Sequence, residues 1–233
     1  MFARNPLILI SALISLTLVS IQAHAGGRPD SSSRNWFGHI SGGYAFASGD
    51  TSDAVDDDWT IGGGALYWPA SWPIGISLDV NYLKMDLSRS SIDAINDAIA
   101  SDPNNDGEVT GGDFDNLQFA VNGIWSLGPE TSHGLYLTAG ISYNNMTGRV
   151  FEDGLIYYPP ICDPWFWWCY PGGVGPGQIV TGKRSENEFG WSVGAGYSFD
   201  TMSGQLFVEA RYQQIQAFGE DVEYIPLVVG YRW

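Results

Sequence analysis

The chain is poor in basic residues, cysteine and histidine. Its 233 residues include 10 Lys and Arg against 26 Asp and Glu, 2 cysteines and 3 histidines, and its formal net charge is −16 at pH 7. A surface this acidic repels a phosphate backbone, so we expect no nucleic-acid partner.

Beyond its first residues the chain also lacks long apolar runs. A transmembrane helix needs about 20 consecutive apolar residues, and no segment after Val19 approaches this length. An all-helical membrane protein is therefore excluded. Near the N-terminus, Arg4 precedes an apolar run from Leu7 to Val19, and residues 23–25 have the small-x-small pattern of a cleavage site. This combination predicts a secretory signal peptide over residues 1–25.

Instead, the chain has apolar and polar residues that alternate with the period of two typical of β-strands. The last segment places Ile225, Leu227, Val229, Tyr231 and Trp233 on one parity. Eight segments alternate in this way, at about residues 35–48, 58–68, 74–85, 115–127, 135–149, 189–199, 205–216 and 224–233. The opposite parity is rich in Gly and Ser, which suits the narrow interior of an eight-stranded barrel.

The connections between these segments alternate in length. Those at 69–73, 128–134 and 200–204 are tight, whereas those at 49–57, 86–114 and 150–185 are longer. Outer-membrane barrels have short periplasmic turns and long outside loops, and hydrocarbon does not tolerate an open sheet edge. A soluble lipocalin-like barrel, with the apolar stripe turned inward, is the alternative, but aromatic residues near the strand ends favour the membrane barrel.

We therefore expect an all-β fold, namely an eight-stranded antiparallel up-and-down transmembrane β-barrel over residues 35–233. The barrel follows a periplasmic linker at residues 26–34 and carries long outer loops at 86–114 and 150–185.

Three stretches carry a family resemblance: Leu135–Gly140, Phe189–Gly196 and Ile225–Trp233. Over nearly all of the predicted mature chain, the sequence resembles the small eight-stranded outer-membrane β-barrels of Gram-negative bacteria. These are related in fold to the transmembrane domain of outer membrane protein A and to the outer membrane protein X group. The resemblance implies a protein of the cell outer membrane, with both termini periplasmic, that contacts the lipid bilayer and lipopolysaccharide.

The same resemblance implies that the barrel assembly machinery reads the last strand. Tyr231 and Trp233 would form this assembly signal, although Trp233 stands where the family usually ends in Phe. We expect the barrel to be a monomer.

The loop after the third strand contains residues 102–113, DPNNDGEVTGGD, which resemble the calcium loops of EF-hand and dockerin domains. Hard oxygen ligands fall at the expected positions, and Gly107 allows the sharp turn. Asp113 is shorter than the usual closing Glu, so we expect Ca²⁺ to bind weakly; a solvated acidic loop that matches by chance is the alternative. The candidate metal ligands are Asp102, Asn104, Asp106, Glu108 through its backbone carbonyl, Thr110 and Asp113.

Isoleucines at helical spacing predict a helix over residues 91–100, entering this loop.

The loop after the fifth strand holds both cysteines, Cys162 and Cys169. An oxidising compartment favours a disulfide between them. The aromatic patch that they bracket is either an exposed knob for a partner, glycan or lipid, or a plug packed on the barrel mouth. This loop aromatic patch consists of Trp165, Phe166, Trp167 and Trp168.

Four charged residues lie on the inward parity: Asp79, Glu209, Arg211 and Arg232. We expect opposite charges in so narrow a lumen to pair and to hold the strands together. A proton or ion path is the alternative, although an eight-stranded interior is normally filled by side chains.

Catalysis by a serine needs a base within hydrogen-bond reach. After the predicted signal peptide the chain has only His39, on the inward parity, and His133, in a turn, and no Ser/His/acid grouping stands out. We therefore expect a non-enzymatic outer-membrane protein with a structural or surface-interaction role, whose outer loops bind ions or a surface partner. A narrow porin-like pore for ions or small solutes and a lipid-modifying outer-membrane enzyme are the alternatives.

Overall fold

The computed structural model describes residues 35–69, 72–101, 107–127, 134–158, 161–163, 168–170, 173–217 and 219–233. All of them belong to one unit, Asn35–Trp233. The predicted signal peptide and linker lie outside the described residues.

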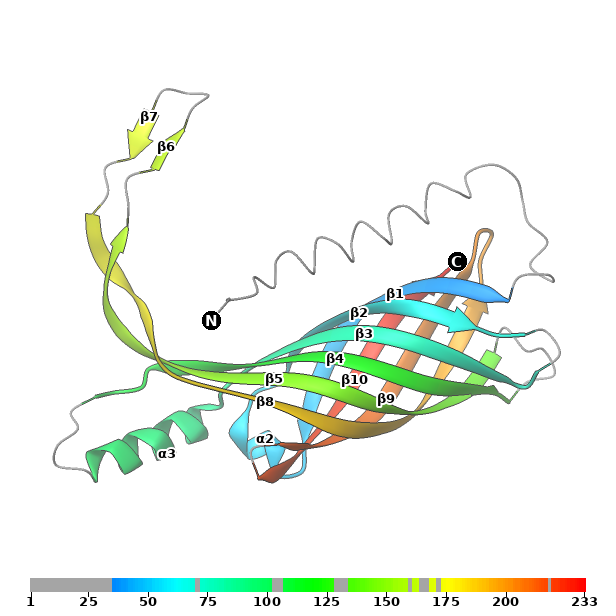
Figure 1. The fold of residues 1–233 in the computed structure, drawn as a ribbon, viewed down its shortest axis with the longest axis horizontal. Helices are drawn as coiled ribbons and strands as arrows, with labels where there is room; N and C mark the ends of the chain where they lie inside the picture. The colour runs from blue at the N-terminus through cyan, green and yellow to red at the C-terminus, as the bar shows by residue number, and fades with distance from the viewer. Residues whose placement is uncertain are drawn as a thin grey trace. The chain divides into compact units, whose positions relative to one another are not determined.

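Eight antiparallel strands close into a barrel in the order β1-β10-β9-β8-β5-β4-β3-β2 (Figure 1). The ring closes where β1 pairs with β10, from His39 opposite Arg232 to Ser48 opposite Glu223. This confirms the predicted fold class. The barrel strands are β1 (Trp36–Ser48), β2 (Asp58–Tyr67), β3 (Ile74–Asp86), β4 (Gly111–Ser126), β5 (Gly134–Tyr158), β8 (Gly173–Asp200), β9 (Gln205–Ala217) and β10 (Glu220–Arg232).

The two ends of the barrel differ. The connections from β2 to β3, from β4 to β5 and from β8 to β9 lie at one end, together with the start of β1 and the end of β10 (Figure 1). We call this the turn end. The opposite end, the loop end, carries the helices α2 (Thr51–Ala54) and α3 (Arg89–Ala100). There the connection from β9 to β10 is tight, because Gly219 adopts a φ of 91°, which residues with a Cβ rarely adopt.

Helix α3 matches the helix predicted before residue 102. Ser88 caps its N-terminus, since its side chain accepts a hydrogen bond from the backbone N–H of Ser91 at 3.2 Å. In the second half of the helix, Asn96 exchanges two hydrogen bonds with the backbone of Val109, which fixes the chain that returns to β4. Within the described residues no helix has the length and apolarity needed to cross a membrane.

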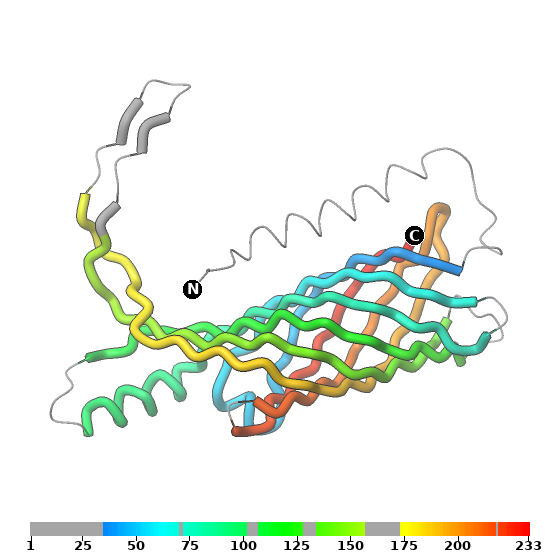
Figure 2. The backbone as a smooth tube through the Cα atoms, in the orientation of Figure 1, coloured from blue at the N-terminus to red at the C-terminus, as the bar shows by residue number. Residues whose placement is uncertain are grey.

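The prediction of a loop over residues 150–185 was wrong for much of that segment. β5 continues to Tyr158 and β8 begins at Gly173, and these two residues pair with each other. The pairing of β4 with β5 ends at Phe151, and that of β9 with β8 ends at Gly190, so β5 and β8 run on together as a two-stranded ribbon (Figure 2). Glycine and proline interrupt the period of two here, so only the pairing of the backbones reveals the strands.

Two other boundaries also differ from the predictions. β4 begins at Gly111, inside the predicted loop 86–114, and β10 begins at Glu220 rather than near residue 224. A short separate sheet pairs β6 (Ile161–Asp163) with β7 (Trp168–Tyr170).

The outer face of the barrel is apolar between two aromatic belts. At the turn end the rings of Trp36 and Tyr67 lie 4.8 Å apart, and at the loop end those of Tyr44 and Phe46 lie 5.4 Å apart. Between the belts, Ile40 is 55% exposed. At about 3.3 Å per residue and a strand tilt of about 40°, the belts are roughly 20–25 Å apart, the height of the apolar band of outer-membrane barrels.

The inner face is built in three layers. Leu66, Trp68, Ile124 and Tyr136 form an apolar cluster at the turn end. Polar and charged side chains fill the middle, and a second apolar cluster fills the loop end. The residues of this loop-end cluster are Ala45, Val55, Leu83, Met85, Phe114, Met146, Ile215, Ala217 and Tyr224.

Candidate functional site

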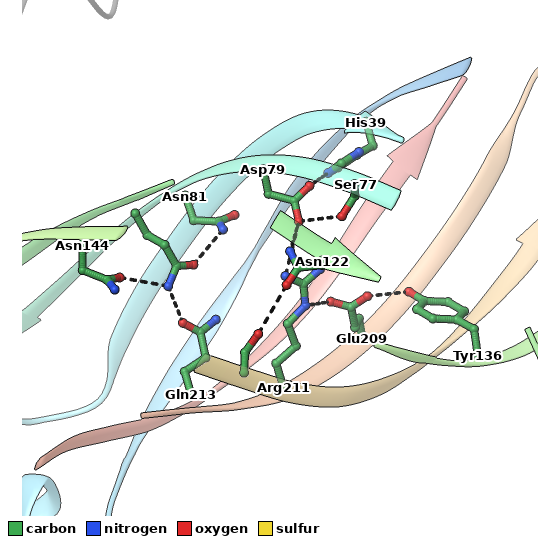
Figure 3. Close-up of polar contacts among 12 residues, drawn as sticks. His39, Ser77, Asp79, Asn81, Asn122, Tyr136, Asn144, Glu209, Arg211 and Gln213 are labelled. Carbon is green, nitrogen blue, oxygen red and sulfur yellow. Dashed lines mark hydrogen bonds and ion pairs between the residues drawn. The ribbon is translucent and has the colours of Figure 1, made fainter. Parts of the chain in front are cut away.

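An ion-pair cluster lies across the middle of the lumen (Figure 3). Arg211 on β9 contacts two carboxylates: its Nη1 lies 3.4 Å from Oδ2 of Asp79 on β3, and its Nε donates to Oε1 of Glu209. The hydroxyl of Tyr136 donates to Oε2 of Glu209 at 2.8 Å. Asp79 and Glu209 are only 4% and 2% exposed. Because β3 and β9 are not neighbours in the ring, Arg211 joins opposite walls of the barrel.

Three further side chains hold the Asp79 carboxylate. Its Oδ2 accepts hydrogen bonds from Asn122 Nδ2 at 2.6 Å and from Ser77 Oγ at 3.1 Å, and its Oδ1 lies 3.1 Å from His39 Nε2. Hydrogen bonds to a charged acceptor are roughly twice as strong as neutral ones. One buried carboxylate therefore ties together β1, β3, β4 and β9.

A ladder of amides continues from this cluster toward the loop end. Gln118 Nε2 donates to Asn144 Oδ1 at 3.0 Å and to Gln213 Oε1 at 2.7 Å, and Gln118 Oε1 accepts from Asn81 Nδ2 at 3.0 Å. Asn116 Nδ2 also donates to Asn144 Oδ1, at 3.2 Å. These side chains come from β3, β4, β5 and β9, so the ladder crosses the lumen as the charges do.

Arg232 lies on the turn-end side of the cluster. Its guanidinium is 5.0 Å from the centroid of the Phe207 ring and 5.9 Å from that of Tyr136, within the range of cation–π attraction. Gly196 and Gly230 make room for these rings, because a Cβ on the first would clash with Tyr136 and one on the second with Phe207. This accounts for part of the glycine content of the inward parity.

Buried side chains fill much of the lumen along the described strands. A cavity of about 40 Å³ remains beside the ion pairs, lined by residues such as His39, Asn116 and Glu209. At roughly 10–15 Å³ for each water molecule, that volume holds about three waters. The two apolar clusters lie beyond it on either side. The geometry thus suits cross-bracing of the barrel wall.

Comparison with protein families decides what kind of barrel this is. Residues 11–232 match the model of the outer membrane protein beta-barrel domain. The chain belongs to this family. It is an outer-membrane protein that contacts the lipid bilayer. No curated protein sequence matches significantly.

Solved structures of similar proteins share little sequence with this outer-membrane barrel. Ail, the attachment invasion locus protein of Yersinia pestis, solved with the heparin analogue sucrose octasulfate, is 13% identical, with a TM-score of 0.46 over 86% of this chain and 100% of that one. Neisserial surface protein A is 13% identical, with a TM-score of 0.45 over 85% and 96%. The N-terminal barrel of Pseudomonas aeruginosa OprF is 13% identical, with a TM-score of 0.36 over 86% and 98%.

The predicted lumen charges of this outer-membrane barrel do not all meet. Asp79, Glu209 and Arg211 form one cluster, whereas Arg232 lies over aromatic rings. Sequence reasoning did not identify Tyr136, which occupies the inward parity of β5 beside a glycine of the next strand. Its position could have been noticed in the sequence, because Tyr136 is an aromatic residue on a face where small residues predominate, and it pairs with Gly196.

The predicted calcium loop is described only from Gly107 onward, and residues 102–106 lie outside the described residues. Oδ2 of Asp113 is 3.2 Å from Arg149 Nη1, and Thr110 Oγ1 donates to Asp153 Oδ1 at 3.1 Å. Burial raises the pKa of the Asp113 carboxyl above its ordinary value, although Arg149 opposes the shift. In the part of the chain that is described, no group of three or more His, Cys, Asp or Glu side chains could hold a metal ion. The calcium site stays a prediction.

The two cysteines lie on the paired strands β6 and β7, whose backbone register sets Cys162 opposite Cys169. The disulfide between them stays a prediction. In the loop aromatic patch, residues 165–167 lie outside the described residues, and Trp168 begins β7.

Proposed function

We propose that this protein is a non-enzymatic, closed outer-membrane barrel of a Gram-negative cell. It acts through its loop end, where α3, the segment leading into β4 and the β5–β8 ribbon interact with ions, lipopolysaccharide or a partner at the cell surface. One observation carries this proposal: the braced lumen lies between two apolar layers, which leaves the segments beyond the rim as the accessible part of the protein.

The family architecture supports one orientation in the membrane. Short turns face the periplasm and long connections face outward, so both chain ends of the barrel lie on the periplasmic side. Tyr231 and Trp233, whose rings are 6.4 Å apart, then form part of the periplasmic aromatic belt and are the signal read by the assembly machinery. The closed ring needs no partner strand, which supports a monomer.

The lumen geometry also supports a non-enzymatic role. Ser77 donates to Asp79 and not to His39, so these three side chains lack the order of nucleophile, base and orienting acid. All three are buried between the apolar layers, where a lipid substrate has no access.

The conductance of the purified barrel in a planar bilayer tests this function against the pore alternative. A closed lumen passes no steady current, whereas a narrow pore gives reproducible conductance steps.

Calcium binding by residues 102–113 is part of the proposal. We expect calorimetric titration of the refolded protein with Ca²⁺ to give saturable heat, with a dissociation constant on the order of 10⁻⁴ to 10⁻³ M. Asp102→Ala removes the first ligand and should abolish the heat. Asp93→Ala, on the exposed face of α3 and outside the motif, is the matched control and should leave it unchanged. No heat from the unmodified protein, or full heat from Asp102→Ala, would rule out the site.

A further inference from the structure

The β5–β8 ribbon has two edges that no described strand covers. On one side β4 stops pairing with β5 at Phe151, and on the other β9 stops pairing with β8 at Gly190 (Figure 2). Beyond these points each strand pairs only with its ribbon partner. A two-stranded ribbon is marginally stable in water, and each uncovered edge is a row of backbone N–H and C=O groups to which a further strand can add.

Phe151 marks the start of the uncovered edge of β5. Its backbone carbonyl faces the β4 side, where it accepts a hydrogen bond from the backbone N–H of Thr110 at 2.8 Å. Because the backbone groups of a strand alternate between its two sides, those of Asp153 and Leu155 face the same side as those of Phe151. No described strand pairs with β5 there, so these N–H and C=O groups can pair with an added strand.

A proline blocks the opposite edge of the ribbon. Asp153 pairs with Gln178 and Leu155 with Pro176, so the backbone groups of these two β8 residues also point away from the ribbon partner. Proline has no N–H to donate, and in sheets it is confined to such uncovered positions. The ribbon thus has one edge that is unsuited to strand addition and one, on β5, that contains no proline among residues 150–158.

Exposed apolar side chains accompany this edge. Leu155 is 72% exposed, and Val174 and Val180, on the same face of the ribbon, are 66% and 51% exposed. Burial in lipid would cover these side chains but would leave the backbone groups of both edges unpaired in hydrocarbon, which is unfavourable. A polypeptide strand covers the same side chains and also pairs the backbone groups of Asp153 and Leu155.

The ribbon is acidic. Residues 150–182 contain Glu152, Asp153 and Asp163 but no Lys, Arg or His. Asp153 is exposed, and its Oδ1 accepts a hydrogen bond from the uncharged hydroxyl of Thr110 at 3.1 Å, which leaves the carboxylate its negative charge. A partner with positive side chains is therefore complementary to this edge.

We propose that the β5 edge of the ribbon binds an extended polypeptide segment of a surface partner, in which apolar side chains alternate with Lys or Arg. The segment adds beside β5 as a further strand and pairs with the backbone of Asp153 and Leu155. This inference rests on the proposed surface role of the loop end and deepens it, because it names the class of partner and the strand that holds it.

The test uses the full barrel in nanodiscs of phosphatidylcholine, which carries no net charge. The peptide acetyl-Lys-Val-Lys-Val-Lys-Val-Lys-amide is titrated while amide hydrogen exchange is followed by NMR. We expect saturable slowing of exchange at Asp153 and Leu155 and none at Gln178, on the opposite edge. A peptide with Glu in place of Lys should bind about fivefold or more weakly, because attraction becomes repulsion. A peptide with methylated backbone nitrogens should not bind, because it cannot donate to the edge.

Two proline substitutions add an independent check. Leu155→Pro removes an outward N–H without removing a hydrogen bond of the ribbon, and it should weaken binding of the lysine peptide by about tenfold or more. Gln178→Pro makes the same change on the opposite edge and should leave binding unchanged. Gel mobility before and after boiling checks that both variants are folded.

No saturable slowing at Asp153 and Leu155 overturns the proposal, and so does equal binding of the methylated peptide, of the Glu peptide or by Leu155→Pro. Slowing at both amides on addition of phosphatidylcholine vesicles alone would assign the ribbon to lipid and would overturn it as well. None of these results bears on conductance. Steady current through a barrel that still binds the peptide would instead contradict the closed barrel of the proposed function.

Discussion

Arg211→Ala should lower the free energy of unfolding of the barrel by about 3–5 kcal/mol, the typical cost of removing one partner from a buried ion pair. Arg211 contacts Asp79 and Glu209, and without it two carboxylates that are 4% and 2% exposed face each other's charge in a closed lumen. The side chain also bridges walls that are not neighbours in the ring, so its loss removes a cross-brace as well as a charge. Urea titration of the barrel folded into lipid vesicles measures the effect.

Two further variants separate charge from packing. Arg211→Lys keeps the charge but not the planar fork that reaches both carboxylates, so we expect an intermediate loss. The triple variant Asp79→Asn, Glu209→Gln, Arg211→Met removes all three charges together and should recover most of the stability, because buried ion pairs are often replaceable by neutral groups. Two results would contradict the role given to the ion pairs. One is an Arg211→Ala barrel that is as stable as the unmodified barrel, and the other is a triple variant that is no more stable than Arg211→Ala.

Ile40→Arg should cost about 2–4 kcal/mol of stability in a bilayer, because the side chain lies midway between the aromatic belts, where charge meets hydrocarbon. Ile40 is 55% exposed on β1, with Trp36 toward the turn end and Tyr44 toward the loop end.

The matched control is Ile74→Arg, at the first residue of β3. Ile74 is 47% exposed and lies at the level of the turn-end belt, where the same substitution should cost only about 0–1 kcal/mol. Urea titration in vesicles measures both variants. Equal costs at the two positions would mean that the apolar stripe does not cross the hydrocarbon.

The wall of the barrel was predictable from the sequence, because lipid on one side and a narrow lumen on the other impose a period of two on every strand. β1, β2, β3 and β9 therefore begin and end close to the predicted positions. The β5–β8 ribbon was not predictable in this way, since neither of its faces is buried against a core and no alternation is imposed. Its strands exist because each backbone continues the pairing of the other, across a register shift between Val150 and Phe151.

Only part of the barrel interior could be predicted from the sequence. Inward charges such as Asp79 and Arg211 could be listed from parity, but they are 132 residues apart and meet only when the ring closes with its particular register. Leu83 and Met85 share the inward parity with Asp79 and close the loop end. Along β3 the inward positions thus change from polar to apolar toward the loop end, and this change is the sequence signal of the apolar layer there. The signal is easily missed, because most inward positions of the barrel carry small or polar residues.

Single-channel recording of the purified, folded barrel in planar bilayers tests the central claim most directly. A wide porin, recorded in the same bilayers, establishes that insertion is efficient, and gel mobility before and after boiling establishes that the protein added was folded. The closed lumen, with its ion pairs between two apolar layers, predicts no steady conductance at any voltage that the bilayer withstands. Reproducible conductance steps whose number rises with the amount of folded protein would contradict it.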